Sequence, residues 1–543
     1  MEKINKLHLA LSGILSGLLL WASWPDKGFP FIIFIAFVPL LIIDHIIWHY
    51  TAENKSIKLF LFIFPAFLIW NFLTSFWIHK ATLAGAIATV ILNSLMMFLP
   101  FLLYHKLSVV MKRRMPVYFI AVFWLGLEYL FLNWDLAWPW LNIGNVFATV
   151  PQFVQWYEFT GIFGGAVWIW IINILVFNIL LIISPKLQTL KFSMSFNIIS
   201  YIILLIIFII FPVIISFSIK NIKSEEIKGN IVIVQPNIDP YHEKFASGTF
   251  TEQLQTLIRL SESQADSNTL LFVWPETALS LPFDEERFLE SNYTQVILEF
   301  LAKYPNAKLI SGIDSYRFFK KGEKLSETAR FYEYDSSYYD AYNAAVFMDF
   351  RGRFEFYHKS ILVPGVEKMP YPKVFKFLSR LTIDLGGTSG SLGKQAEPSI
   401  FQVNEKITAA PIICYESVFG NYVSKFVKKK ANLITIMTND GWWGNTAGHR
   451  QHFQYARLRA IETGKYIVRS ANTGISGYID PEGNIIEQTK FWEEAAIKVP
   501  VLVNDKLTFY TRTGDYLGRI AAFTSVLLLI LLISKGLIKK KPL

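Results

Sequence analysis

The sequence predicts a membrane α-helical bundle joined to an α/β domain, and three observations support this fold class. Of the 543 residues, 53% are hydrophobic and only 17% are charged, whereas about 25% of the residues of a soluble protein carry a charge. The apolar residues form long runs before about residue 220 and again near the C-terminus. Between these regions, short β-branched runs alternate with amphipathic helical stretches, a pattern typical of helices packed on sheets.

The apolar runs have the length of membrane-spanning helices. About 20 apolar residues cross the hydrocarbon core of a bilayer, and about eight segments meet this length, at residues 8–24, 28–48, 58–78, 82–105, 115–133, 161–184, 196–219 and 518–538. Further spans follow the first segment directly, so we do not expect it to be a cleaved signal peptide. The expected organisation is a membrane region over 1–220 with about seven helices, an α/β domain over 221–510, and a last helix with a basic tail over 511–543.

The charge of the loops predicts the orientation. Basic residues cluster near both ends of the chain and between the fourth and fifth spans, at Lys3, Lys6, Lys106, Lys112, Arg113, Arg114 and Lys539 to Lys541. The loop 132–160 has no Lys or Arg. Because basic loops stay in the cytoplasm, we expect both termini there and residues 220–517 outside. The net charge of +10 is explained by these loops, so no nucleic acid partner is expected.

The loop from Trp134 to Phe159 is rich in Trp and Phe. It is compatible with an aromatic belt at the membrane interface and with the wall of a lipid-entry site.

The central region predicts buried strands at 231–235, 270–274, 308–312, 410–414 and 432–438, and helices at 251–263 and 451–463. The polar, Tyr-rich stretch 321–342 is expected to be an exposed loop.

Chemistry-bearing side chains stand in three short stretches, each at the end of a predicted strand. The three stretches are Trp274 to Thr277, Tyr357 to Pro364 and Ile412 to Glu416. They contain Glu276, Lys359 and Cys414, the single cysteine, respectively. Sites in open α/β sheets are built at strand ends. A thiol can act as nucleophile, a carboxylate as its base and an ammonium as the stabiliser of an oxyanion. Each residue alone has a structural explanation, but together they supply the groups needed for acyl transfer.

Several longer motifs carry a family resemblance, namely Lys359-x-x-Leu-Val-Pro followed by Glu367, Cys414-Tyr415-Glu416, Thr438 to Trp443, and Arg457 to Asn472. Glu276, Lys359 and Cys414 resemble the Glu-Lys-Cys triad of the nitrilase superfamily. The motifs, with several spans before this domain and one after it, resemble the apolipoprotein N-acyltransferases, and the resemblance covers nearly the whole chain.

The resemblance implies a nitrilase-like α-β-β-α sandwich and a ping-pong acyltransferase of the bacterial inner membrane, with its catalytic domain on the periplasmic side. A phospholipid would donate its acyl chain to Cys414 as a thioester. The acceptor would be the α-amine of the S-diacylglyceryl cysteine of an apolipoprotein, giving a triacylated lipoprotein. Glu276 would be the base and Lys359 the oxyanion partner, with Glu367, Tyr415 and Glu416 in support. No cofactor is implied.

The sequence departs from the family pattern at two places. Pro364 to Glu367 reads Pro-Gly-Val-Glu where the family often has Pro-Phe-Gly-Glu, and the spacing to Glu367 is kept. The loop after the first strand lacks the Trp often found there, and Tyr241 or Phe245 is the candidate substitute. Trp442 and Trp443 are candidates to touch the acyl chain or to pack in the core.

Three other functions and a metal site are the alternatives to acyl transfer. A transporter is disfavoured because the apolar segments contain few ionisable residues, such as Asp44 and Glu128. A membrane-tethered amidase or nitrilase would share the triad but use water as the second nucleophile. A non-enzymatic membrane scaffold would keep the domain but would have lost catalysis. The scaffold is disfavoured because all three triad residue types are present. His449 and His452 could share a helical face, but two ligands without others at suitable spacing do not predict a metal site.

Overall fold

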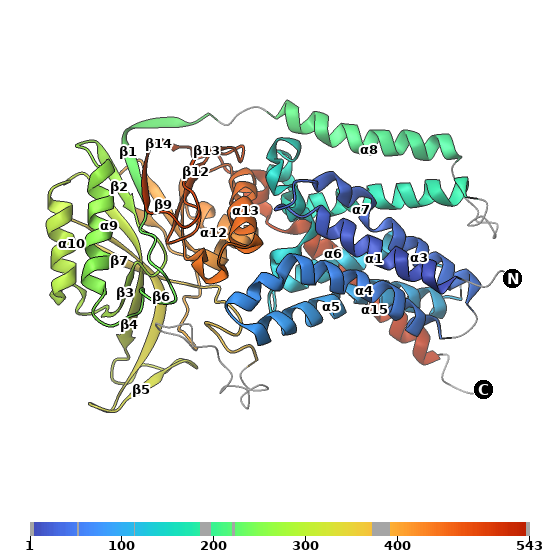
Figure 1. Cartoon of the computed structure of the whole chain (residues 1–543), viewed down its shortest axis with the longest axis horizontal. Helices are drawn as coiled ribbons and strands as arrows, with labels where there is room; N and C mark the ends of the chain where they lie inside the picture. Colours follow the sequence, from blue (N-terminus) through green and yellow to red (C-terminus); the bar gives the residue numbers. More distant parts are fainter. Residues whose placement is uncertain are drawn as a thin grey trace. The chain divides into compact units, whose positions relative to one another are not determined.

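The computed structural model describes residues 5–51, 54–112, 114–184, 197–219, 223–371 and 391–538. Chain contacts divide it into a helical unit and an α/β unit (Figure 1). The helical unit comprises Met1–His79, Leu83–Lys220 and Thr513–Leu543, and the α/β unit comprises Lys80–Thr82 and Asn221–Arg512. Some basic residues used for the predicted orientation lie outside the described residues, namely Lys3, Arg113 and Lys539 to Lys541.

The helical unit contains a helix at each predicted apolar segment. The helices are α1 (Lys6–Ala22), α2 (Ile33–Ala36), α3 (Val38–Tyr50), α4 (Lys55–Ser75), α5 (Leu83–Val110), α6 (Tyr118–Leu132), α7 (Tyr157–Ile183), α8 (Ile198–Ser218) and α15 (Tyr516–Ile538). Within the described ranges, six helical stretches are long and apolar enough to cross a membrane, whereas α1 and α6 are shorter. Helix α8 exposes large apolar side chains such as Ile203 and Phe211, as a helix solvated by lipid does.

The aromatic loop before α7 packs inside the helical unit. Residues 139–148 form short 3₁₀ turns and are all buried. Glu128 Oε1 accepts hydrogen bonds from the Ile143 amide at 2.8 Å and from the Trp124 indole at 3.0 Å. The Tyr157 hydroxyl donates to the Gly144 carbonyl at 2.9 Å. This central part of the loop is therefore an interior element of the unit. In an aromatic belt at the membrane interface, the rings would instead be exposed to lipid.

Two sheets form the α/β unit. The first contains β1 (Glu225–Gln235), β2 (Thr269–Val273), β3 (Leu279–Asp284), β4 (Lys308–Phe318), β5 (Arg330–Tyr332), β6 (Ser337–Asp349), β7 (Phe354–His358) and β14 (Ala495–Val503). Its order is β14-β1-β2-β4-β6-β5, with β3 beside β4 and β7 beside β6. The second contains β8 (Phe401–Gln402), β9 (Thr408–Ile413), β10 (Leu433–Thr438), β11 (Tyr466–Ala471), β12 (Gly477–Ile479) and β13 (Ile485–Gln488), in the order β13-β12-β11-β10-β9-β8.

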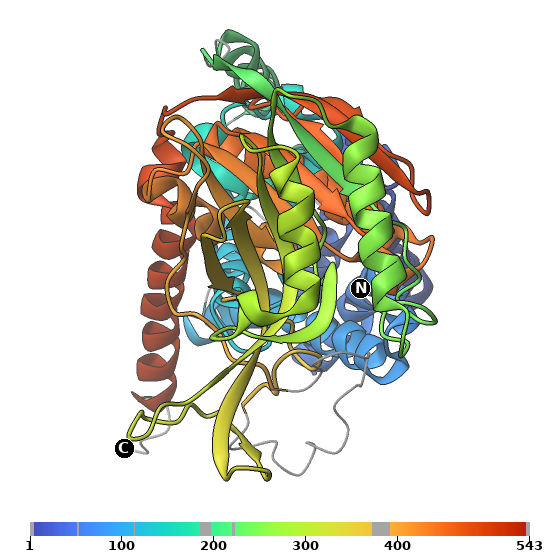
Figure 2. The same cartoon turned by 90° about the vertical axis from the view of Figure 1, so that its left-hand side faces the viewer.

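Helices cover the outer face of each sheet. Helices α9 (Phe250–Gln264) and α10 (Asn292–Ala302), in green in Figure 2, pack on the first sheet through a core that includes Leu257, Phe272 and Ile297. Helices α12 (Gly420–Lys428) and α13 (Ala447–Thr463) contact the second sheet. The sheets face each other, with β1 against β11 and β6 against β9. The predicted α-β-β-α sandwich is thus confirmed. The last helix of the unit is α14 (Phe509–Thr513).

Each predicted strand and helix of this unit is present, but the exposed loop predicted at 321–342 is partly wrong. Strand β5 and the start of β6 lie there, and Asp340 to Tyr342 are buried. Strand β6 pairs with β4, which places Phe318 opposite Tyr339. Aromatic residues favour strands through such cross-strand contacts, and here this preference outweighs the polar composition of the stretch.

Candidate active site

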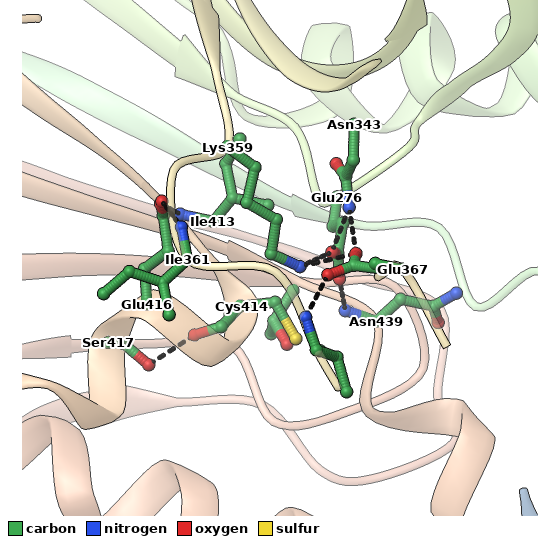
Figure 3. Close-up of polar contacts among 12 residues, drawn as sticks. Glu276, Asn343, Lys359, Ile361, Glu367, Ile413, Cys414, Glu416, Ser417 and Asn439 are labelled. Carbon is green, nitrogen blue, oxygen red and sulfur yellow. Dashed lines mark hydrogen bonds and ion pairs between the residues drawn. The ribbon is translucent and has the colours of Figure 1, made fainter. Parts of the chain in front are cut away.

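The strands of the α/β unit bring Glu276, Lys359 and Cys414 into one site (Figure 3). Glu276 lies in the turn after β2, Lys359 follows the last residue of β7, and Cys414 follows the last residue of β9. Strands β2 and β7 belong to the first sheet and β9 to the second. The site therefore lies between the two sheets, at the ends of their strands.

The turn that carries Glu276 is tightly packed against β4. Its next residue, Thr277, has a φ of 48°, a left-handed value that costs free energy for a residue with a Cβ. The Gly312 amide donates to the Pro275 carbonyl at 3.1 Å. A Cβ at Gly312 would stand 2.5 Å from the Glu276 Cα. A side chain at position 312 would therefore clash with the turn, and glycine avoids this clash.

The Glu276 carboxylate is buried and fully hydrogen-bonded. Oε1 accepts from Asn343 Nδ2 at 2.9 Å and from Lys359 Nζ at 3.1 Å, and Oε2 accepts from the Asn439 amide at 3.0 Å. Burial by itself would raise the pKa of Glu276, but the Lys359 ammonium and these donors outweigh it and hold the pKa below its ordinary value. Glu276 is therefore ionised at neutral pH and able to accept a proton.

Lys359 is held between two carboxylates. Its ammonium is 2.8 Å from Glu367 Oε1 and 3.1 Å from Glu276 Oε1, and the residue is 1% exposed. Burial opposes the charge, but Glu276, Glu367 and the Cys414 thiol raise the pKa of Lys359 well above its usual value. Asn343 Nδ2 also donates to Glu367 Oε1 at 2.8 Å. The ammonium therefore stays charged and fixed in direction.

Cys414 stands at a sharp backbone turn and is partly exposed. Its φ is 48°, so the backbone at Cys414 is conformationally strained. Burial in the protein and the negative charge of Glu276 raise the pKa of the thiol well above its ordinary value, against the opposing effect of Lys359. The resting thiol is protonated, and a hydrogen bond from it helps to lower the pKa of Glu276. Attack by this sulfur requires a base, and Glu276 is in place to serve.

Glu416 links the lysine segment to the nucleophile turn. Its Oε1 accepts from the Tyr357 hydroxyl and the Ser360 amide, both at 2.7 Å, and its Oε2 accepts from the Ile413 amide at 2.9 Å. Ile413, which precedes Cys414, and Ser360, which follows Lys359, are thereby both tied to one buried carboxyl group. Tyr415 is also buried and packs on Phe419.

A buried polar chain reaches the backbone of Cys414 from the other side. The Ser417 hydroxyl donates to the Cys414 carbonyl at 2.7 Å and lies 2.9 Å from His452 Nε2. His452 Nδ1 is 2.9 Å from Asp440 Oδ1, and Arg469 donates to Asp440 Oδ2 at 2.7 Å. Burial would raise the pKa of Asp440, but Arg469 and His452 hold it below its usual range. His452 is engaged in this chain, and His449 stacks on Phe491 instead.

The aromatic candidates separate into two environments. Trp442 packs edge-on against Tyr241 and is stacked with Phe245, and the Tyr241 hydroxyl donates to the Trp442 carbonyl at 2.6 Å. These three form the aromatic cluster. In the sequence, Trp442 is three residues after Asn439, whose backbone amide binds Glu276, and Phe245 directly follows Lys244, whose ammonium binds the Glu276 carbonyl. Trp443 packs on His452 instead.

Three residues of the site escaped prediction from the sequence: Asn343, Asn439 and Lys244. The Asn343 side chain bridges the two carboxylates that hold Lys359. The backbone amide of Asn439 donates to the Glu276 carboxylate, and the Lys244 ammonium donates to the Glu276 backbone carbonyl at 2.9 Å. A buried asparagine in an alanine-rich strand was the available signal for Asn343. Nothing in the sequence distinguishes Lys244 from a surface lysine.

The α/β unit matches a known family over most of its length. Residues 231–504 match the sequence model of the carbon–nitrogen hydrolases. Since this match covers about half of the chain, the protein belongs to the carbon–nitrogen hydrolase family. Residues 16–175 of the helical unit match the model of the apolipoprotein N-acyltransferase N-terminal domain.

Curated relatives extend the similarity to both units. An apolipoprotein N-acyltransferase of Chlorobaculum tepidum is 29% identical over 92% of both chains. One of Geobacter metallireducens is 26% identical over 93% of this chain and 91% of its own. Among solved structures, Nit3 of Saccharomyces cerevisiae, a member of branch 10 of the nitrilase superfamily, is 16% identical with a TM-score of 0.36, covering 52% of this chain and 92% of its own.

Proposed function

We propose that this protein is an N-acyltransferase that moves a fatty acyl group from a phospholipid to the α-amine of the diacylglyceryl cysteine of an apolipoprotein. The observation that carries the proposal is the geometry of the buried site. A protonated thiol on a strained turn stands beside an ionised carboxylate and a fixed ammonium. The names of the relatives, which match both units, supply the substrate class.

In the first half-reaction, the Cys414 sulfur attacks the sn-1 ester carbonyl of the phospholipid while its proton moves to the Glu276 carboxylate. The Lys359 ammonium stabilises the negative oxygen of the tetrahedral intermediate. The intermediate collapses when the ester C–O bond breaks. The departing alkoxide takes the proton from Glu276, which yields a lysophospholipid and a thioester on Cys414.

In the second half-reaction, the amine of the acceptor attacks the thioester carbonyl. Glu276 accepts a proton from the attacking nitrogen and returns it to the departing sulfur, so the thiol is restored and an amide is formed. Glu367 and Glu416 hold Lys359 and the turn of Cys414 in place through both steps. The aromatic cluster offers an apolar surface beside the base for the acyl chain.

The helical unit fits substrates that live in a bilayer. We propose that about eight helices cross the bacterial inner membrane and that the α/β unit lies on the periplasmic side. The support is the distribution of basic loops in the sequence. An enzyme fixed at the surface where donor and acceptor are both anchored loses less orientational freedom on encounter.

The test is acyl transfer by the purified protein in detergent or lipid. The protein is mixed with phospholipid vesicles and a synthetic diacylated lipopeptide, and both are followed by mass spectrometry. We expect lysophospholipid release and an acyl mass on the lipopeptide amine. Release of free fatty acid without an acylated lipopeptide would identify a hydrolase and refute the proposal.

A further inference from the structure

Lys244 is a second buried lysine beside the proposed base. It is 3% exposed, and its ammonium donates a hydrogen bond of 2.9 Å to the backbone carbonyl of Glu276. The carbonyl belongs to the strained turn that ends at Thr277. The lysine therefore holds the backbone of the catalytic residue, whereas Lys359 holds its carboxylate.

The charge of Lys244 is poorly solvated. Burial lowers the pKa of Lys244 to about 8, against the opposing effects of Glu276 and of Asp314 on β4. A buried charge is costly unless it is paired, and these two carboxylates are the charged groups that act on it. At neutral pH the ammonium adds positive potential to that of Lys359 near Glu276 and supports its ionised form.

The same segment carries two members of the aromatic cluster. The Lys244 carbonyl accepts from the Ser280 hydroxyl at 3.2 Å and from Gln253 Nε2 at 3.1 Å. Phe245 follows directly, and Tyr241 lies three residues earlier, and both pack on Trp442. A displacement of these rings would move the anchor of the Glu276 turn.

We propose that Lys244 is a positioning residue that couples the aromatic cluster to the catalytic base. An acyl chain that settles against Tyr241, Phe245 and Trp442 would fix this segment, and Lys244 would transmit the fixed position to Glu276. This inference rests on the proposed function, because it takes acyl transfer to Cys414 as the reaction.

Lys465 provides a matched control for the loss of a buried lysine. It is 1% exposed, and burial lowers its pKa also to about 8. Its ammonium binds carbonyl oxygens of Asn504 and Lys506 at 2.6 and 2.8 Å. Its hydrogen bonds go to these residues and to no member of the site. Lys465→Met should therefore change stability without changing the chemistry.

The experiment compares the full-length wild type with Lys244→Met, Lys244→Arg and Lys465→Met. The rate of acyl addition to Cys414 is followed by mass spectrometry at several vesicle concentrations, and thermal unfolding reports folding. We expect Lys244→Met to lower the maximal rate about 10- to 100-fold, as a small misplacement of a catalytic group does. The vesicle concentration for half-maximal rate should change less than threefold. Lys465→Met should acylate at the wild-type rate.

The pH profile separates positioning by a charge from mere packing. The wild-type rate should fall as the pH rises through about 8, because Lys244 then loses its proton. The fall should move to higher pH in Lys244→Arg, whose guanidinium stays charged, and should vanish in Lys244→Met. A wild-type rate in folded Lys244→Met, or an unmoved fall in Lys244→Arg, would overturn the inference. Absence of acyl on the wild type would refute the proposed function instead.

Discussion

Glu367 tests whether the fixed ammonium is needed for catalysis. Its Oε1 accepts from Lys359 Nζ and Asn343 Nδ2, both at 2.8 Å, and its Oε2 accepts from the Val363 amide at 2.8 Å. In Glu367→Gln, one oxygen can still face Lys359 and Asn343. The new NH₂ group must then face the Val363 amide, so two donors oppose each other and the ion pair is lost.

The magnitude follows from these contacts. A hydrogen bond to a charged group contributes about 1.5 to 3 kcal/mol, and Lys359 loses one such partner while Glu276 remains. If the loss falls on the transition state, the rate of Cys414 acylation should drop about 10- to 150-fold. The loss should appear in the maximal rate, because Glu367 contacts Lys359, the proposed oxyanion partner, and not the proposed substrate surface.

The assay is the rate at which an alkyne-labelled phospholipid marks the protein. Glu355→Gln is the control. Glu355 is a half-exposed residue of β7, the strand that leads to Lys359, and among the described residues its ion pair is with the exposed Arg353. A surface pair contributes about 0 to 1 kcal/mol, so labelling of this variant should match the wild type. Equal labelling rates for Glu367→Gln and the wild type would refute the reasoning.

Three further outcomes are expected. Glu276→Gln should lower the acylation rate by about 100- to 10,000-fold, and labelling of this variant at the wild-type rate would contradict the proposed role of Glu276 as base. Ser417→Ala removes the hydroxyl that lies between His452 Nε2 and the Cys414 carbonyl, while Asp440 still holds His452 Nδ1. It should lower the free energy of unfolding by about 1 to 3 kcal/mol, measured by thermal unfolding, and an unchanged value would oppose a structural role for this polar chain. Gly312→Ala should abolish labelling while the helical unit still inserts, and normal labelling would show that the turn can move.

The sequence predicted the triad because its residue types follow buried strands. Glu276 and Cys414 come after apolar, β-branched segments whose ends could be located from composition alone. The helices at 251–263 and 451–463 were predicted for a similar reason, since the period of their apolar residues is local information.

The remaining site residues depend on tertiary arrangement. Asn343 reaches the two carboxylates only because β6 lies between β4 and β7, and this order is not local information. The stretch that contains the start of β6 looked polar, so its burial was missed. Lys244 becomes a buried charge only when its segment folds onto the Glu276 turn. In the helical unit, burial of residues 139–148 depends on contacts with Glu128 and Tyr157 that no periodicity reveals.

The most direct measurement is the mass of the peptide that contains Cys414 after the protein has been exposed to phospholipid vesicles without an acceptor. The wild-type peptide should gain one fatty acyl group that hydroxylamine removes, as expected of a thioester, and Cys414→Ala should gain none. A wild-type peptide that stays unmodified while the lipopeptide is still acylated would contradict the central claim that Cys414 carries the acyl chain.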